Sequence, residues 1–103
     1  MNQTIKTGNP FSTLFIMRES KSREAIEIPS DMQISSKIVN ASGQEIAVCE
    51  ITVCDQTEMK GGFILYVDKS ITANWKAGTA LGDIKINGKN SGNYSFTIEK
   101  SIT

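Results

Sequence analysis

Apolar and polar residues alternate with a period of two along most of this 103-residue chain, as in strands that bury one face. In one segment Met32, Ile34 and Ile38 share a face, and in another Ala47 and Cys49 do. Polar or charged turns separate the segments. We therefore predict strands over residues 11–18, 25–29, 31–39, 45–54, 63–68, 80–86 and 93–100.

The connection between the last two strands has two possible registers. A two-residue turn over residues 87–88 is the stronger short-range hairpin signal, but it places Ile84 opposite Ser91. A five-residue loop over residues 88–92 places Ile84 opposite Phe96. Because opposed residues share a face of the sheet, the longer loop keeps both apolar sets on the core side, and we predict it.

Short strands separated by polar turns at intervals of about 8–12 residues are typical of an all-β sandwich. We predict one domain over residues 1–103, an immunoglobulin-like antiparallel β-sandwich of six to seven strands. One helical turn is expected to begin near Ser70 or Thr72. The N-terminal residues 1–8 are expected to pair as an added strand, either on their own sheet or in a neighbouring molecule.

The formal net charge is zero, from 11 basic and 11 acidic residues, so no global charge favours nucleic acid or an anionic membrane. No apolar run approaches the ~20 residues that span a bilayer, and the N-terminus lacks the apolar stretch of a signal peptide. We therefore expect a protein of the reducing cytosol without nucleic-acid or membrane partners. The segment 18–24 mixes both signs of charge and is expected to be a solvated hairpin tip.

The two cysteines, Cys49 and Cys54, are five residues apart. If residues 45–54 form one strand, they lie roughly 16 Å apart on opposite faces. A disulfide needs Cα atoms within about 7 Å, and this spacing without histidine makes a poor zinc site. We expect one buried and one near-surface thiol.

Reactive groups form no recognisable constellation in the sequence. The chain has no histidine, so the commonest general base and a frequent metal ligand are missing. The nearest carboxylate pairs, Glu45 with Glu50 and Asp55 with Glu58, fall in a predicted strand and a predicted loop. We predict no catalytic, cofactor-binding or metal-binding residues, and a protein that is not an enzyme.

Trp75, the single tryptophan, lies just before a predicted strand. One interpretation is a plug for the open end of the sandwich, with a buried ring whose N–H reaches a carbonyl. The other is an exposed anchor at an interface, where tryptophan is enriched. Tyr66 and Asp83 are further candidates for contacts with a partner or ligand.

The C-terminal third reads T-A-x-W-x-x-G-x-x-x-x-D-I-K-I, then a glycine-rich turn, Y-S-F-T-I-E-K and S-I-T. This pattern resembles a small family of phage and prophage proteins that end in a Trp-x-x-Gly segment, an Asp-apolar strand, a Ser/Thr-rich strand and a closing Val/Ile-Thr. Upstream, GNPFSTLFIM resembles the family's opening strand, and MQISSKIVNASGQEIAVCEITV its central strand pair. The layout is similar, more remotely, to the N-terminal domain of phage upper baseplate proteins. Gly82 departs from the pattern, because an aromatic or apolar residue often precedes the aspartate.

The resemblance implies a non-enzymatic structural component of a phage or prophage virion, in the tail, baseplate or head–tail region. Such a protein acts by contacts with other virion proteins or with its own copies, first in the host cytoplasm and then in the particle. The alternative is a β-sandwich module that binds a small ligand or carbohydrate through Trp75, Tyr66 and Asp83. The structural role predicts a mostly buried Trp75, whereas the ligand-binding role predicts a solvent-facing Trp75 beside a pocket.

Overall fold

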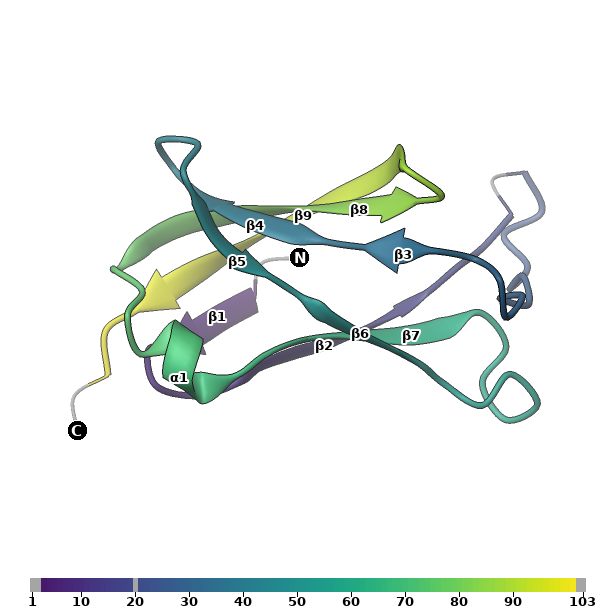
Figure 1. Ribbon diagram of the computed structural model, residues 1–103, viewed down its shortest axis with the longest axis horizontal. Helices are drawn as coiled ribbons and strands as arrows, with labels where there is room; N and C mark the ends of the chain where they lie inside the picture. Colours follow the sequence, from purple (N-terminus) through teal and green to yellow (C-terminus); the bar gives the residue numbers. More distant parts are fainter. Residues whose placement is uncertain (1–2, 20, 102–103) are drawn as a thin grey trace.

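The computed structural model describes residues 3–19 and 21–101, which form two stacked β-sheets and one helical turn (Figure 1). The sequence-based prediction of an all-β sandwich is confirmed. The elements within these residues are β1 (Gln3–Lys6), β2 (Phe11–Ile16), β3 (Ile34–Ser35), β4 (Lys37–Asn40), β5 (Glu45–Val48), β6 (Glu50–Val53), β7 (Gly62–Val67), α1 (Lys69–Thr72), β8 (Gly78–Ile86) and β9 (Lys89–Glu99).

The larger sheet has the strand order β1-β9-β8-β4-β5, with β3 paired to β8, and the smaller sheet has the order β2-β7-β6. Every strand pair is antiparallel except β1 with β9, which run parallel with Gln3 beside Phe96. The described part of the N-terminus therefore folds back on its own sheet, which decides between the two pairings expected for it. The parallel pair makes the larger sheet mixed, where a fully antiparallel one was predicted.

Two of the predicted strands are each interrupted at one buried residue, and this explains why the structure has more strands than predicted. Residues 31–39 are divided at Ser36, and residues 45–54 at Cys49, where the chain passes from the larger sheet to the smaller one. The Cys49 N–H donates to the Ser36 carbonyl at 2.9 Å, so the two interruptions lie side by side. Cys49 is buried, Cys54 is partly buried and both thiols are free, as expected.

The predicted five-residue loop between the last two strands is wrong. β8 and β9 are joined by a two-residue turn with Ile86 opposite Lys89. Asn87 and Gly88 adopt φ values of 51° and 83°, which suits asparagine and glycine in a tight hairpin turn.

A β-bulge reconciles this tight turn with a buried apolar face. Lys85 pairs with Asn90 but Ile84 pairs with Gly92, so Ser91 is an extra residue in β9. The bulge shifts all later residues of β9 by one position, and the apolar side chains return to the core. The sequence prediction compared two unbulged registers and so could not find this one.

Residues 25–29 were predicted to be a strand, but they form only an isolated bridge between Arg18 and Ala25. The bridge closes the charged tip, where the Glu19 N–H donates to the Glu24 carbonyl at 2.8 Å. The described residues of this tip are mostly exposed, in agreement with the expected solvated hairpin.

The core fills the space between the two sheets, and rings from both sheets stack there. Phe11 of β2 packs on Phe96 of β9 with ring centroids 4.8 Å apart, and Phe15 packs on Phe63 at 5.9 Å. Within residues 3–19 and 21–101, no helix is long and apolar enough to span a membrane. The buried apolar residues are Ile5, Phe11, Ile28, Ile38, Ala47, Cys49, Phe63, Leu65, Val67, Trp75, Ala80, Ile84, Phe96 and Ile98.

Candidate functional site

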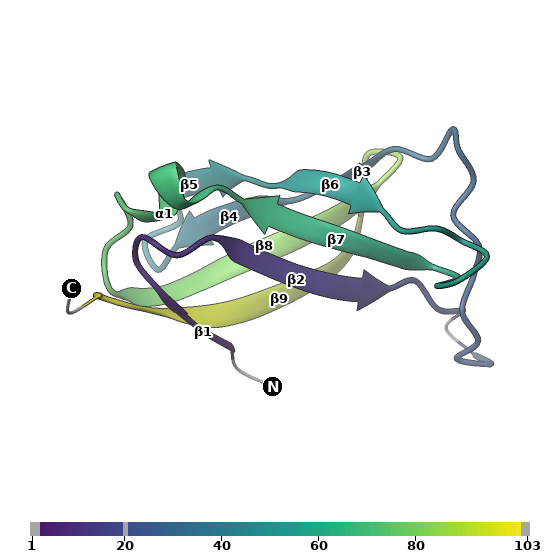
Figure 2. The same cartoon turned by 90° about the horizontal axis from the view of Figure 1, so that it is seen from below.

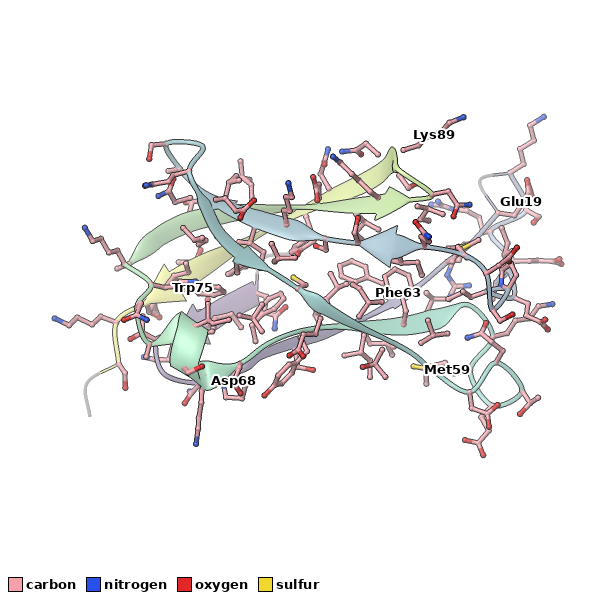
Figure 3. The ribbon with its side chains drawn as sticks, in the orientation of Figure 1. Glu19, Met59, Phe63, Asp68, Trp75 and Lys89 are labelled. Atoms are coloured by element: carbon pink, nitrogen blue, oxygen red, sulfur yellow. The ribbon has the colours of Figure 1, made fainter. Side chains whose placement is uncertain are left out.

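Trp75 is positioned by the short helix α1, which connects the two sheets at one end of the sandwich (Figure 3). Asp68 caps the helix, because its carboxylate accepts from the Ser70 N–H at 3.0 Å and from the Ser70 hydroxyl. These hydrogen bonds lower the pKa of Asp68. The buried Thr72 hydroxyl donates to the Asn9 carbonyl at 2.7 Å, which ties the helix to the turn before β2.

The Trp75 side chain closes this end of the core. It is 7% exposed, and its ring packs against Phe96 with centroids 5.9 Å apart. The indole N–H donates to the Ile46 carbonyl on β5 at 3.2 Å. The interpretation of Trp75 as an end plug with a bonded N–H is therefore confirmed, and its ring is not a solvent-facing platform.

A shallow depression of about 640 Å³ lies outside Trp75, between the β4–β5 turn and α1. The polar groups along it bond largely to one another. Asn40 Oδ1 accepts from the N–H groups of Ser42 and Gln44, and Asn74 donates to the Ser70 carbonyl. The depression is open, and most of its polar groups maintain the local turns instead of converging on one point.

Tyr66 and Asp83, the other two candidate residues, lie on different surfaces. Tyr66 is on the outer face of the smaller sheet, where its hydroxyl donates to Asp68 at 3.3 Å. Partial burial and the Asp68 carboxylate raise the pKa of Tyr66. Asp83 is on the outer face of the larger sheet and accepts from the Lys37 N–H at 3.0 Å, just after the interruption at Ser36.

The structure does not bring the three candidates together into one binding site. Trp75 lies between the sheets, whereas Tyr66 and Asp83 lie on opposite outer faces. Each of them bonds to a nearby backbone or side-chain group and so contributes to local structure.

A buried polar cluster that sequence analysis did not find lies in the core beside Gly82. The Ser36 hydroxyl is within 2.8 Å of the Tyr94 hydroxyl, and Cys49 Sγ lies 3.6 Å from the same oxygen. Burial raises the pKa of the Tyr94 hydroxyl and of the Cys49 thiol. A neutral, poorly accessible thiol is a weak nucleophile, so Cys49 is not suited to covalent chemistry. The contacts of Tyr94 instead hold the two interrupted strands against β9.

Apolar side chains also gather on the outer faces of both sheets, and these surfaces were not predicted. We call Leu14, Ile16, Ile64 and Tyr66 on the smaller sheet the outer patch. Leu14 is 46% exposed and stands directly opposite Ile64 in the ladder between β2 and β7. On the larger sheet Leu81 is 48% exposed and stands opposite Val39. The alternation of FSTLFIM contains a signal for the outer patch, since Leu14 and Ile16 fall on the face opposite Phe11 and Phe15.

Within residues 3–19 and 21–101, no three Cys, Asp or Glu side chains come together in a way that would hold a metal ion. Compared with known protein families and with curated proteins, the chain gives no match.

Proposed function

We propose that this chain is a non-enzymatic structural component of a phage or prophage virion that acts by protein–protein contacts. The observation that carries the proposal is the exposure of apolar side chains on both sheets, with Leu14 at 46% and Leu81 at 48%. Apolar residues gathered on an outer sheet face are a feature of protein contact sites. A particle component needs such surfaces and needs no reaction centre.

Two further features support this proposal. The C-terminal third of the sequence, from Thr72 to Thr103, resembles the phage and prophage family. Trp75 is used as an internal plug, and Asp83 holds the Lys37 N–H, so both residues serve the fold. We further propose that the chain lies in the tail, the baseplate or the head–tail region of the particle.

The test is to purify particles from a host that carries the gene, after inducing its prophages, and to identify their proteins by mass spectrometry. We expect this chain at constant stoichiometry to the major structural proteins through density-gradient fractions. An abundant cytosolic protein of the same host serves as the control and should be lost. Particles that lack the chain, from a host that expresses it, would contradict the proposal.

A ligand-binding module is the second candidate, because the depression of about 640 Å³ beside Trp75 is large enough for a small sugar. Titration of the protein with mono- and oligosaccharides, followed by amide chemical shifts, distinguishes the two candidates. Saturable shifts confined to residues such as Ser42, Ile71 and Asn74 would favour the module. The virion role predicts none.

A further inference from the structure

β2 is an end strand of the smaller sheet, and one row of its backbone groups faces no other strand of that sheet (Figure 2). The Met17 N–H donates to the Gly61 carbonyl at 2.8 Å and so points toward β7. Because backbone groups alternate along a strand, the N–H and C=O groups of Ser12, Leu14 and Ile16 point away from β7.

The β2 edge lacks the protection that the end strands β1, β5 and β6 have. Natural proteins guard exposed edges with charged side chains, proline, bulges or very short strands. Among the described end strands, β1 carries Lys6, β5 carries Glu45 and β6 carries Glu50. β2 carries no charge, is six residues long and pairs with β7 in an unbroken register. A strand of this kind readily accepts another strand.

We propose that β2 pairs with β2 of a second copy of this chain across a two-fold axis. In the register that joins the most outward groups, Leu14 stands opposite Leu14 of the second copy, and Ser12 opposite its Ile16. Each of these pairs exchanges two N–H···O=C bonds. The two three-stranded sheets then form one continuous six-stranded sheet with the order β6-β7-β2-β2-β7-β6.

A second copy fits this edge for reasons of both chemistry and symmetry. A two-fold contact requires a surface that complements itself, and an uncharged strand meets its copy without repulsion. The pairing brings the two outer patches together, because Leu14 and Ile64 share one face with Leu14 of the second copy. It also covers Phe15, whose ring faces the core but stays partly exposed beside the open edge.

The contact is expected to be weak. One strand pair alone buries less than the ~1,200 Å² of a standard interface, so the dimer should form reversibly as concentration rises. The inference goes beyond the proposed function, since it names one surface and one occupant, and it holds whether or not the chain belongs to a virion.

The test is sedimentation of the full chain over a wide concentration range, with the variants Leu14→Lys and Leu81→Lys. Leu14→Lys sets two like charges opposite each other at the two-fold axis. It should raise the dissociation constant of the dimer at least about tenfold. Leu81 is equally exposed but lies on β8 inside the larger sheet, so Leu81→Lys is the matched control and should dimerise like the parent.

Two further measurements make the test specific to this edge. An equimolar mixture of Leu14→Lys and Leu14→Glu chains should restore a dimer, since the charges are then opposite. Hydrogen exchange at the amides of Ser12, Leu14 and Ile16 should slow as concentration rises, while exchange at the β6 edge does not change. A monomer at every concentration, or a dimer that Leu14→Lys leaves intact, would overturn the inference.

Discussion

Tyr94 occupies the space that a side chain at Gly82 would fill. The two residues stand opposite each other in β8 and β9, and a Cβ added at Gly82 would overlap the end of the Tyr94 ring. The Tyr94 hydroxyl thereby reaches Ser36 and Cys49, where two strands are interrupted. The glycine thus permits one tyrosine to link β9 with both interruptions.

We predict that Gly82→Ala destabilises the protein by about 1–3 kcal/mol, because the buried methyl group must displace the ring of Tyr94. Urea unfolding followed by circular dichroism measures this change. Gly92→Ala is the control in the same hairpin, since a Cβ there meets no atom within 4 Å. Equal stability of the two variants would show that Tyr94 moves aside without cost.

Tyr94 should make the folded state sensitive to alkaline pH. Burial raises its pKa above the ordinary value of 10.0, so the folded chain keeps a proton that the unfolded chain has lost. The stability that Tyr94 contributes is therefore complete below pH ~10 and declines as pH rises further. The raised pKa of Cys49 has the same sign and starts to act near its ordinary value of 9.0.

The measurement is urea unfolding at several values between pH 7 and pH 11, with Tyr94→Phe and Tyr66→Phe compared. Tyr94→Phe should lose about 1–3 kcal/mol at pH 7, because the buried Ser36 hydroxyl loses its hydrogen bond to Tyr94, and should show a shallower alkaline decline. Tyr66→Phe should retain most of the decline, because Tyr66 lies on an outer face and its raised pKa contributes less than that of Tyr94 in the core. If both variants decline equally, the alkaline sensitivity does not come from Tyr94.

The alternation of side chains predicted which residues face the core, but the sequence did not show how strands interact across the sheets. Burial of Ile38, Ala47 and Phe96 follows from period two, whereas the end plug at Trp75 follows from a large ring with a polar N–H placed just before a strand. The bulge at Ser91 could not be predicted, because it depends on the tight turn and the buried face acting together.

The roles of the polar residues were harder to predict than the positions of the apolar ones. Asp83 bonds to the Lys37 backbone only because β4 lies beside β8, a neighbour 46 residues away in sequence. From the sequence alone Tyr66 and Asp83 are candidates for contacts, because the sequence does not show that they bond to Asp68 and to the Lys37 N–H. The outer patch around Leu14 was missed because an exposed leucine is common and indicates nothing without its neighbours.

The Gln56 side chain links two loops by hydrogen bonds. We predict that Gln56→Ala lowers the free energy of unfolding by about 2–3 kcal/mol. Its Oε1 accepts from the N–H groups of Ile28 and Gly61, both at 2.8 Å, and its Nε2 donates to the Cys54 carbonyl at 2.9 Å. The alanine variant leaves two partly buried N–H groups without these partners. Urea unfolding measures the loss, and the exposed Gln33 provides the control as Gln33→Ala. A loss of stability equal to that of the control would show that water replaces the hydrogen bonds of the Gln56 side chain.

Trp75 should behave as a core residue in solution, with blue-shifted emission that acrylamide quenches poorly until the chain unfolds. The reason is its 7% exposure and the packing of its ring on Phe96. Because Trp75 lies between the sheets and β2 pairs at its outer edge, this emission should stay constant as the protein dimerises. Trp75→Ala should destabilise the fold by about 3–5 kcal/mol, since it removes a buried ring from the end of the core.

Ile71→Ala is the matched control for Trp75→Ala, since Ile71 borders the same depression but is 41% exposed. We expect this variant to change stability by no more than about 0.5 kcal/mol, as is usual for surface positions. A Trp75 emission that is red-shifted and easily quenched in the folded protein would contradict the plug. It would also favour the ligand-binding module, because that function requires a solvent-facing ring at this depression.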